Sequence, residues 1–386
     1  MFSRRTNWKL APNRFSIALE KHRAAGREVL DLTASNPTEI GLHCDGQAIL
    51  QALANPQALR YRPEPKGMIS AREAVAAYYR GRGEEVDAGR IVLTTSTSEA
   101  YSFVFRLLCD TQDEVLAPAP SYPLFDFLAD LQDVRLRPYP LLYDHGWQVD
   151  LHALRSVLGP RTRAIMAVHP NNPTGSYLKA PEAEQLSNIC AQRGLALVVD
   201  EVFLDFAHDG AQRPSFATNA DALTFTLSGL SKIAGLPQMK LAWIVVSGPE
   251  ELAAKALGRL EVIADTYLSM NAPVQLAAPS CFAQGPEFQR QAMARIRSNL
   301  GELDRQAAAR PSCTRLHAEG GWYAVLRVPV TRPDEQLAIE LLEQTGVLVH
   351  PGHFYDFPAE GYIVLSLITP EEEFREGVAR GMRFQI

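Results

Sequence analysis

Residues that could carry chemistry are concentrated in four short polar segments, each of which follows an apolar run. They are TTSTSEA (94–100), HPNNPTG (169–175), DEVF (200–203) and SGLSKIAGLPQMK (228–240). Short apolar runs that alternate with stretches of helical length predict the strands of a parallel sheet. Ligands of open α/β sheets bind at the carboxyl ends of the strands, so these four segments are candidate parts of one site.

Each segment also has an ordinary structural explanation. Asp200 follows the apolar run LALVV, so its carboxylate ends a buried strand, where a salt bridge or a helix cap would also account for it. Lys232, taken alone, has the residue type that is most often a solvated loop charge. Thr97 and Ser98 begin a predicted helix whose free N–H groups either bind an anion such as phosphate or are capped.

Together, the four segments supply a reactive amine, a buried acid, an Asn-Pro turn and an anion cradle. Pyridoxal phosphate (PLP) needs such a set of partners. Its aldehyde requires a lysine, its pyridine nitrogen requires an acid that keeps it protonated, and its phosphate requires hydrogen-bond donors. The combination therefore predicts a PLP site.

The motifs HPNNPTG, DEVF and GLSK, in that order, resemble those of the fold type I PLP enzymes, the class I/II aminotransferases of the aspartate aminotransferase superfamily. The separations agree with that family: 28 positions from Asn172 to Asp200, 32 from Asp200 to Lys232 and 8 from Lys232 to Lys240. The resemblance covers nearly the whole chain. It implies an enzyme that transfers an amino group between an amino acid and a 2-oxo acid through an internal aldimine on Lys232.

The resemblance implies roles for residues around the pyridine ring of the cofactor. Lys232 would form the Schiff base and then act as general base and acid at the substrate α-carbon. Asp200 would pair with the pyridinium nitrogen, and Tyr122 would stack on the ring. Asn172 would donate to the 3-oxygen from a turn in which a cis bond to Pro173 is expected.

Other matched positions belong to the phosphate end of the cofactor. Thr97 and Ser98 correspond to the phosphate-binding turn of relatives, and Ser231 directly precedes the lysine. Lys240 stands where most relatives have an arginine, so a point charge replaces a bidentate fork. Tyr61, in YRPEPKG, corresponds to a tyrosine that reaches the phosphate of the partner subunit, which implies a homodimer with shared sites.

Two positions depart from the family pattern. Phe203 replaces a tyrosine that donates to the 3-oxygen, and its loss should raise the pKa of the aldimine. In GYIVLSLITP, Val364 takes the place of the arginine that grips the substrate α-carboxylate, and residues 351–374 contain no Lys or Arg.

Three explanations compete for the missing arginine: another cation binds the carboxylate, the substrate is not an ordinary α-amino acid, or the register of the segment is misread. We slightly favour the first. The candidate cations, for each of which surface solvation is the more common role, are Arg4, Arg5, Arg14 and Arg327.

Ser35, Asn36 and His353 are candidate substrate contacts. The family places the loop of His353 and Tyr355 near the substrate, so these two residues are candidates for setting specificity. His350 and His353, in HPGHFYDF, resemble a pair of metal ligands. Their spacing lies across Pro-Gly, however, and no third ligand is suggested, so we expect no metal.

Other reaction classes were weighed against transamination. The alternative within PLP chemistry is a lyase or decarboxylase acting on an amino acid or amine, because it would share the Schiff base. A serine hydrolase would need glycine at the fifth position of GLSKI, where Ile233 stands. A dinucleotide-dependent dehydrogenase would need a GxGxxG turn, which the sequence lacks.

Composition bounds the class of protein. The chain has 386 residues, of which 46% are hydrophobic and 21% charged, with a net charge of -6. These values predict a soluble globular protein of two or three domains, without a basic surface for nucleic acid and without a membrane span. Five scattered cysteines without a CxxC pair favour the reducing cytoplasm. Residues 1–19 contain no acid, which fits a transit peptide, although we favour an arm packed on the fold.

The elements that must position these residues follow from the pattern along the chain. From residue 89 onward, alternating strands and helices predict an α/β fold with a mostly parallel sheet between two layers of helices. Long helices after residue 253, notably 287–310, lead to a smaller α+β unit. We expect strands at GWYAVLRV, VLVH and YIVLSLI there, and helices at 335–344 and from 370.

The predicted domain division follows the same change of pattern. We assign residues 1–45 to an N-terminal arm and part of the small domain, with residues 15–25 packing on that domain. Residues 46–275 form the large PLP-binding domain, and residues 276–386 form the small C-terminal domain.

Overall fold

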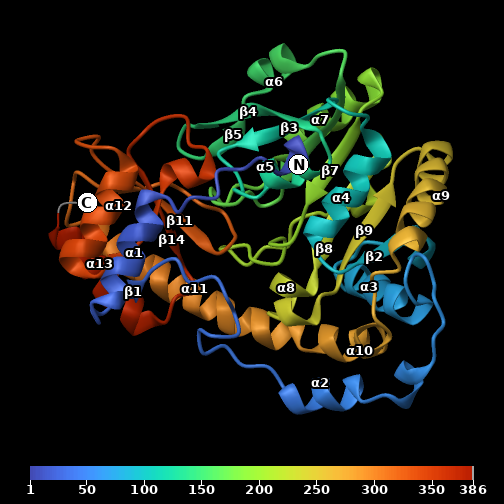
Figure 1. Cartoon of the computed structure of the whole chain (residues 1–386), viewed down its shortest axis with the longest axis horizontal. Helices are drawn as coiled ribbons and strands as arrows, with labels where there is room; N and C mark the ends of the chain where they lie inside the picture. Colours follow the sequence, from blue (N-terminus) through green and yellow to red (C-terminus); the bar gives the residue numbers. More distant parts are fainter. Residues whose placement is uncertain (385–386) are drawn as a thin grey trace.

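The computed structural model describes residues 1–384 and is built around an eight-stranded sheet (Figure 1). The strand order is β2-β9-β8-β7-β6-β3-β4-β5. The strands are β2 (Ile91–Thr94), β3 (Glu114–Ala119), β4 (Arg135–Tyr143), β5 (Trp147–Val149), β6 (Thr162–Val168), β7 (Ala196–Asp200), β8 (Thr224–Gly229) and β9 (Ala242–Ser247). β9 is antiparallel to both of its neighbours and β5 is antiparallel to β4, whereas the β8-β7-β6-β3-β4 pairs are parallel. The predicted mostly parallel sheet is confirmed.

Helices cover both faces of this sheet, which explains why β7, β8 and β9 are buried along their whole length. One apolar cluster joins the sheet to α4 (Thr97–Leu108), α5 (Phe125–Leu131) and α9 (Glu250–Tyr267). On the opposite face, two clusters hold the remaining helices of this unit. They are α2 (Gly46–Leu53), α3 (Ile69–Gly81), α6 (Leu151–Val157), α7 (Ala180–Arg193), α8 (Leu230–Ile233) and α10 (Ala272–Ala283).

The smaller unit lies at one end of the molecule (Figure 1). Its four-stranded antiparallel sheet has the order β10-β11-β14-β13. The strands are β10 (Thr314–Arg315), β11 (Tyr323–Arg327), β13 (His350–Pro351) and β14 (Tyr362–Ser366). One apolar cluster packs this sheet against α1 (Arg14–Ala24), α11 (Gly285–Ala307), α12 (Asp334–Thr345) and α13 (Glu371–Arg383).

The predicted elements of this unit are confirmed, with one difference. The VLVH segment is two strands: β12 (Val347–Leu348) pairs with β1 (Leu30–Asp31), and β13 pairs with β14. The chain leaves one sheet and enters another at Val349, which a short apolar run cannot reveal. As expected, α1 packs against α12 from the other end of the chain. The predicted domain bounds stay a prediction.

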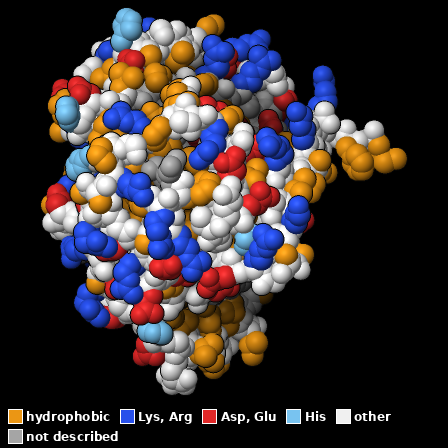
Figure 2. Space-filling view, turned by 90° about the vertical axis from the view of Figure 1, so that its left-hand side faces the viewer, with side chains coloured by type: hydrophobic (Ala, Val, Ile, Leu, Met, Phe, Trp, Pro, Cys, Tyr) orange, Lys and Arg blue, Asp and Glu red, His pale blue; other side chains and the backbone are white. Residues whose placement is uncertain are grey.

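Charged side chains of both signs are interspersed over the end of the molecule formed by the smaller unit (Figure 2). Some of them form ion pairs, such as Arg380 with Glu376 at 2.7 Å and Arg332 with Glu340 at 3.3 Å. This mixture produces no extended field of one sign on that face. Among residues 1–384, no helix has both the length and the apolar character needed to cross a membrane.

Candidate active site

The predicted polar segments meet at one edge of the large sheet. Parallel pairing aligns Val168 of β6 with Asp200 of β7, and Asp200 with Leu227 of β8. The HPNNPTG turn, Asp200 and the segment that carries Lys232 therefore follow three adjacent strand ends. Lys232 lies in α8, a single turn that begins directly after β8. The sequence thus correctly predicted that these segments converge.

Asp200 is buried at the end of β7, with 7% of its surface exposed. Its carboxylate accepts hydrogen bonds from the Tyr101 hydroxyl at 3.1 Å and from the Val202 amide at 3.0 Å. Burial raises the pKa of Asp200 to about 6, although these bonds and the charge of Lys232 oppose the shift. A positive group placed beside this carboxylate would therefore lower its pKa and stabilise its charged form.

Lys232 has the complementary perturbation. Burial lowers the pKa of its amine to about 8, and the charge of Asp200 partly offsets this effect. Its Nζ lies 4.7 Å from the centre of the Trp322 ring and 5.6 Å from that of Phe203. The charge of each group shifts the pKa of the other, although no ion pair within 4.0 Å joins them among residues 1–384. A lysine in this state is a good nucleophile near neutral pH.

Asn172 differs from its neighbour Asn171 in a way that points to a ligand. The Asn171 amide donates to the Pro120 carbonyl at 3.1 Å and to the Thr174 hydroxyl at 2.9 Å. The Oδ1 atom of Asn172 is buried and, within residues 1–384, has no hydrogen-bond partner. Buried polar atoms are rarely left unpaired, so a group absent from the chain itself is expected there. The bond from Asn172 to Pro173 is cis, as expected.

The N-terminus of α4 is capped by a residue that the sequence analysis did not single out. The Ser96 hydroxyl accepts from the Glu99 amide at 3.1 Å, and the Glu99 carboxylate accepts from the Thr95 amide at 2.7 Å. Thr97 and Ser98 are the first two helical residues, whose N–H groups have no acceptor inside the helix. Because Ser96 provides the cap, these two N–H groups are available to an anion.

The other predicted cofactor contacts lie on nearby elements. Ser231 is partly buried in α8, and Lys240 is exposed at the end of a 3-10 turn with φ of 52°. Tyr122 follows β3 and is 39% exposed, and the charge of Asp200 contributes to raising its pKa. Phe203 is buried with its ring centre 5.2 Å from that of Trp322.

The predicted substrate contacts are placed differently from one another. Ser35 lies near the Tyr323 side chain, where it partly offsets the burial that raises the pKa of that phenol. The Asn36 side-chain oxygen accepts hydrogen bonds from the amide and hydroxyl of Thr38, so it stabilises the local turn. His353 is exposed with its ring against Phe354. Its predicted role in specificity stays a prediction.

The candidate replacement cations have other positions. Arg14 pairs with Glu335 of α12 at 3.6 Å, and Arg4 and Arg5 lie exposed in a 3-10 turn near α5. Arg327 is exposed at the far end of β11, opposite Tyr362. It lies four residues from Tyr323, which is about 13 Å along a strand.

A buried polar network that the sequence analysis missed supports α8. Gln289, on α11 of the smaller unit, donates to the Ile233 carbonyl at 3.0 Å and to the Asp205 carboxylate at 3.3 Å. Asp205 also accepts from Tyr78 at 3.0 Å and forms an ion pair with Arg82. These partners are distant in sequence, so no local pattern announces them.

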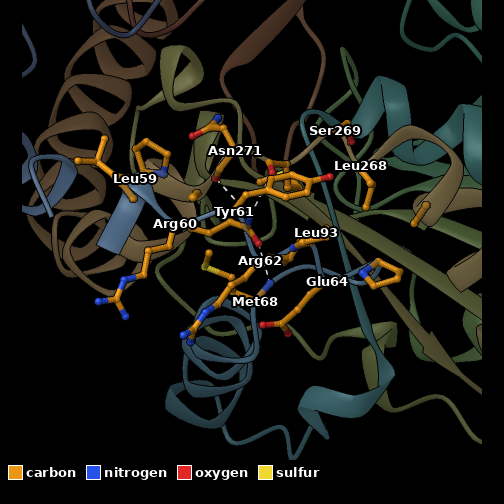
Figure 3. A pocket seen from close by; sticks show the side chains of 18 residues that line it. Leu59, Arg60, Tyr61, Arg62, Glu64, Met68, Leu93, Leu268, Ser269 and Asn271 are labelled. Carbon is orange, nitrogen blue, oxygen red and sulfur yellow. Dashed lines mark hydrogen bonds between the residues drawn. The ribbon is translucent and has the colours of Figure 1, made fainter. Parts of the chain in front are cut away.

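Tyr61 lies outside this cluster, in a pocket of about 320 Å³ on the surface (Figure 3). Its side chain is 82% exposed, and the pocket is completed by Leu268, Ser269 and Asn271 from the turn between α9 and α10. The Ser269 hydroxyl donates to Glu99 in the first turn of α4 at 2.9 Å. The pocket therefore adjoins the predicted phosphate end of the site.

Comparison with known proteins defines the class. Residues 27–380 match the family described as aminotransferase class I and II, so the chain belongs to that family. It is 26% identical over 372 residues to the glutamate-pyruvate aminotransferase AlaA of Escherichia coli, covering 93% of this chain and 91% of that protein. It is 27% identical over 376 residues to the alanine aminotransferase of Mycobacterium tuberculosis, covering 92% and 85%.

Solved structures agree with this assignment. An aminotransferase from Escherichia coli has a TM-score of 0.89 and 25% identity, covering 100% of this chain and 98% of that one. The alanine aminotransferase from Pyrococcus furiosus has a TM-score of 0.90 at 21% identity, covering 100% and 99%, and supports the fold. The chain is thus a PLP-dependent aminotransferase of the aspartate aminotransferase superfamily.

The residues present fit PLP. The side-chain amide of Asn172, the buried Asp200, the perturbed amine of Lys232 and the free N–H groups of Thr97 and Ser98 are of the chemical kinds that the cofactor's polar groups require. Tyr101, which bonds to Asp200, and Trp322, which lies beside Lys232, also belong to this site. The sequence reasoning missed both, because each approaches from far along the chain.

Proposed function

We propose that Lys232 holds PLP through its amine and that the enzyme moves an amino group between a small amino acid and a 2-oxo acid. The observation that carries this proposal is that two neighbouring buried groups have opposite pKa shifts. Burial lowers the pKa of Lys232 to about 8 and raises the pKa of Asp200 to about 6. Two relatives are named for glutamate, pyruvate and alanine, which supports L-glutamate and L-alanine as the first donors to test.

When bound, PLP supplies an electron sink for the bonds at the substrate α-carbon. Asp200 would hold the positive charge of the pyridine nitrogen, and the Tyr101 hydroxyl orients its carboxylate. Lys232, once released, would carry the proton at the α-carbon as general base and acid. Trp322 and Phe203 beside its Nζ restrict water, which keeps the amine's pKa low.

The remaining predicted contacts would fix the position of the cofactor. Asn172 would bond to the 3-oxygen, and Tyr122 would stack on the ring. Thr97 and Ser98 would bind the phosphate with Ser231 and Lys240. The free helix N-terminus supports this arrangement, because its N–H groups and dipole favour a dianion.

An absorption experiment tests this function. The purified protein, loaded with PLP, should show the band of a lysine-bound cofactor, and L-alanine or L-glutamate without a 2-oxo acid should convert it to the pyridoxamine form. A band that persists, or carbon dioxide released with each turnover, would instead support the lyase or decarboxylase alternative. No band after cofactor addition would contradict the proposal altogether.

We also propose a homodimer with shared sites, because the surface around Tyr61 exposes several large apolar side chains. Leu59 and Tyr61 are 92% and 82% exposed, next to exposed Tyr267 and Leu268. Apolar exposure of this extent beside the phosphate end of the site is expected of a surface that a second copy covers.

Substitution of Tyr61 by Phe tests the shared site. Because a lost hydrogen bond to a charged phosphate costs about 1.5–3 kcal/mol, we expect PLP affinity to fall by about tenfold or more. Sedimentation velocity should show a dimer for both proteins. A monomeric wild type, or an unchanged PLP affinity, would contradict the shared site. Tyr267→Phe, at the same surface, is the matched control.

We also propose a cytoplasmic location. All five cysteines are free, and Cys190, Cys281 and Cys313 are buried, which suits a reducing compartment. The segment near Trp8 packs on the fold, since its ring lies 5.5 Å from Phe127 and its Nε1 donates to Asp130 at 2.9 Å. Cell fractionation with an antibody to the native protein would test this location.

A further inference from the structure

The sheet of the smaller unit presents one face to the large unit, and Val364 lies on that face. In β14, Ile363 and Leu365 pack into the core of the smaller unit, whereas Val364 joins the cluster shared with the large unit. Its cross-strand partners are Val325 on β11 and His350 on β13. Directly paired residues share a face, so His350 and Val325 flank the position where relatives carry the carboxylate-binding arginine.

Three neutral polar side chains surround this position. Tyr323 lies on the same face of β11, two residues from Val325. Its ring centre is 6.5 Å from that of Tyr355, which is 4% exposed. The Tyr355 hydroxyl and the His350 Nδ1 atom are 2.9 Å apart. The arginine position is therefore apolar, but phenols and an imidazole lie beside it.

These groups adjoin the reactive amine. The Phe203 ring centre is 6.2 Å from that of Tyr323 and 5.6 Å from the Lys232 Nζ, so the phenol and the amine lie beside the same ring. The Tyr355 carbonyl accepts from the amide of Ser121, the residue before Tyr122, at 2.9 Å. Burial raises the pKa of both phenols and Tyr122 adds to this effect, so both lie near the predicted ring-stacking residue.

We propose, on the basis of the proposed function, that Tyr323 and Tyr355 bind the substrate α-carboxylate in place of an arginine. His350 acts as a positioning residue: its Nδ1–H donates to the Tyr355 oxygen, which leaves the phenolic proton free for the carboxylate. Ser35, which lies beside Tyr323, orients the second phenol in the same way.

The electrostatics support neutral donors. Burial raises the pKa of Tyr323 to about 12 and also raises the pKa of Tyr355 well above its ordinary value, so both phenols keep their protons throughout the neutral range. A hydroxyl bonded to a carboxylate makes a charge-assisted hydrogen bond, which is stronger than a neutral one. Two such donors in a buried site can replace part of what a guanidinium provides, without the desolvation cost of burying a cation beside Val364.

The test compares holoenzymes in which one phenol is removed at a time. For Tyr355→Phe and Tyr323→Phe, we expect KM for the amino donor to rise by about tenfold to a hundredfold, because each loses a bond to a charged group. The absorption band of the bound cofactor and its pKa should stay as in the wild type. Tyr362→Phe is the matched control, since that phenol lies on β14, the strand of Val364, but its ring stacks on Phe357.

The positioning role of His350 has its own readout. His350→Leu should raise KM as Tyr355→Phe does, whereas His350→Asn, whose amide can donate from nearly the same place, should restore a low KM. In the Tyr355→Phe background, His350→Leu should add little, because the pair acts as a unit.

The outcomes separate this inference from the function on which it rests. A wild-type protein that shows no cofactor band would overturn both. The wild-type band could convert normally with the donor while the Tyr323→Phe/Tyr355→Phe double variant keeps an unchanged KM. That result would overturn only the binding of the carboxylate by the two phenols and would leave another cation as its ligand. Loss of the band in either single variant would assign that phenol to cofactor binding or folding and also overturn the inference.

Discussion

The two sides of the active site have changed to different extents relative to the family pattern. The cofactor side, at the strand ends of the large sheet, retains Asn172, Asp200 and Lys232 at the family spacing. The substrate side, on β11 and β14, has Val364 instead of the usual arginine, with phenols beside it. Reaction chemistry depends on the cofactor side, so its ionisable groups are constrained, while the substrate side can exchange charge for shape and neutral donors.

This difference also separates two kinds of electrostatics. On the cofactor side, burial disfavours the charged forms of both groups, so the pKa of Lys232 is lowered and the pKa of Asp200 is raised. On the substrate side, burial keeps Tyr323 and Tyr355 in the neutral form that they already prefer. Variants on the two sides should therefore affect different measurements, and each prediction below tests that separation.

The largest effect is expected for Lys232→Ala. Removal of both the cofactor's attachment and the proton carrier should lower kcat by at least about 10⁴-fold. The lysine-bound absorption band should disappear as well, and borohydride should no longer fix the cofactor to the protein. The exposed Lys255→Ala variant is the control, since its amine pairs only with Glu251 four residues away. Substantial activity in Lys232→Ala would mean that the reactive amine is elsewhere.

Asp200→Asn should have the next largest effect. The isosteric amide keeps the bond from Tyr101 in reach but removes the charge that would stabilise the protonated pyridine nitrogen. Loss of one preorganised electrostatic partner lowers kcat by about 10²- to 10³-fold. The KM of the amino donor should change little, in contrast to the phenol variants. A variant with wild-type kcat would remove Asp200 from the cofactor side.

Asp200→Asn should also change how the rate of PLP capture depends on pH. Only the neutral amine attacks an aldehyde, so capture of PLP by the cofactor-free protein should speed up with rising pH and level off above about 8, the pKa to which burial lowers Lys232. The charge of Asp200 raises that pKa, so Asp200→Asn should move the midpoint to lower pH. Stopped-flow absorbance measures both profiles. Tyr355→Phe should leave the midpoint unchanged, and an equal shift there would break the separation of the two sides.

Phe203→Tyr should have the smallest effect. A phenol at this position would restore a donor to the cofactor's 3-oxygen, so the pKa of the Lys232–cofactor linkage should fall by about one unit or less. Spectrophotometric titration of the two holoenzymes measures the difference. Coincident titrations would show that the ring of Phe203, packed on Trp322, keeps the hydroxyl away from that oxygen.

Much of the cofactor side could be predicted from the sequence. Strand ends of a parallel sheet meet at one edge, so motifs that directly follow apolar runs must lie together, and Asn172, Asp200 and Lys232 do. Tyr101 and Trp322 could not be predicted in this way. Tyr101 bonds to a carboxylate 99 positions away, and Trp322 comes from the other unit of the fold.

The sequence by itself therefore determined the α/β architecture, the order of the cofactor motifs and the absence of a Lys or Arg from residues 351–374. Tertiary structure decided which groups surround the vacated position. Antiparallel pairing of β11, β13 and β14 brings Tyr323 and His350 to one face, and the 3-10 turn after β13 places the Tyr355 hydroxyl 2.9 Å from His350. The physical reason is that strand alternation predicts two faces, while only packing against the large sheet decides which face meets Lys232.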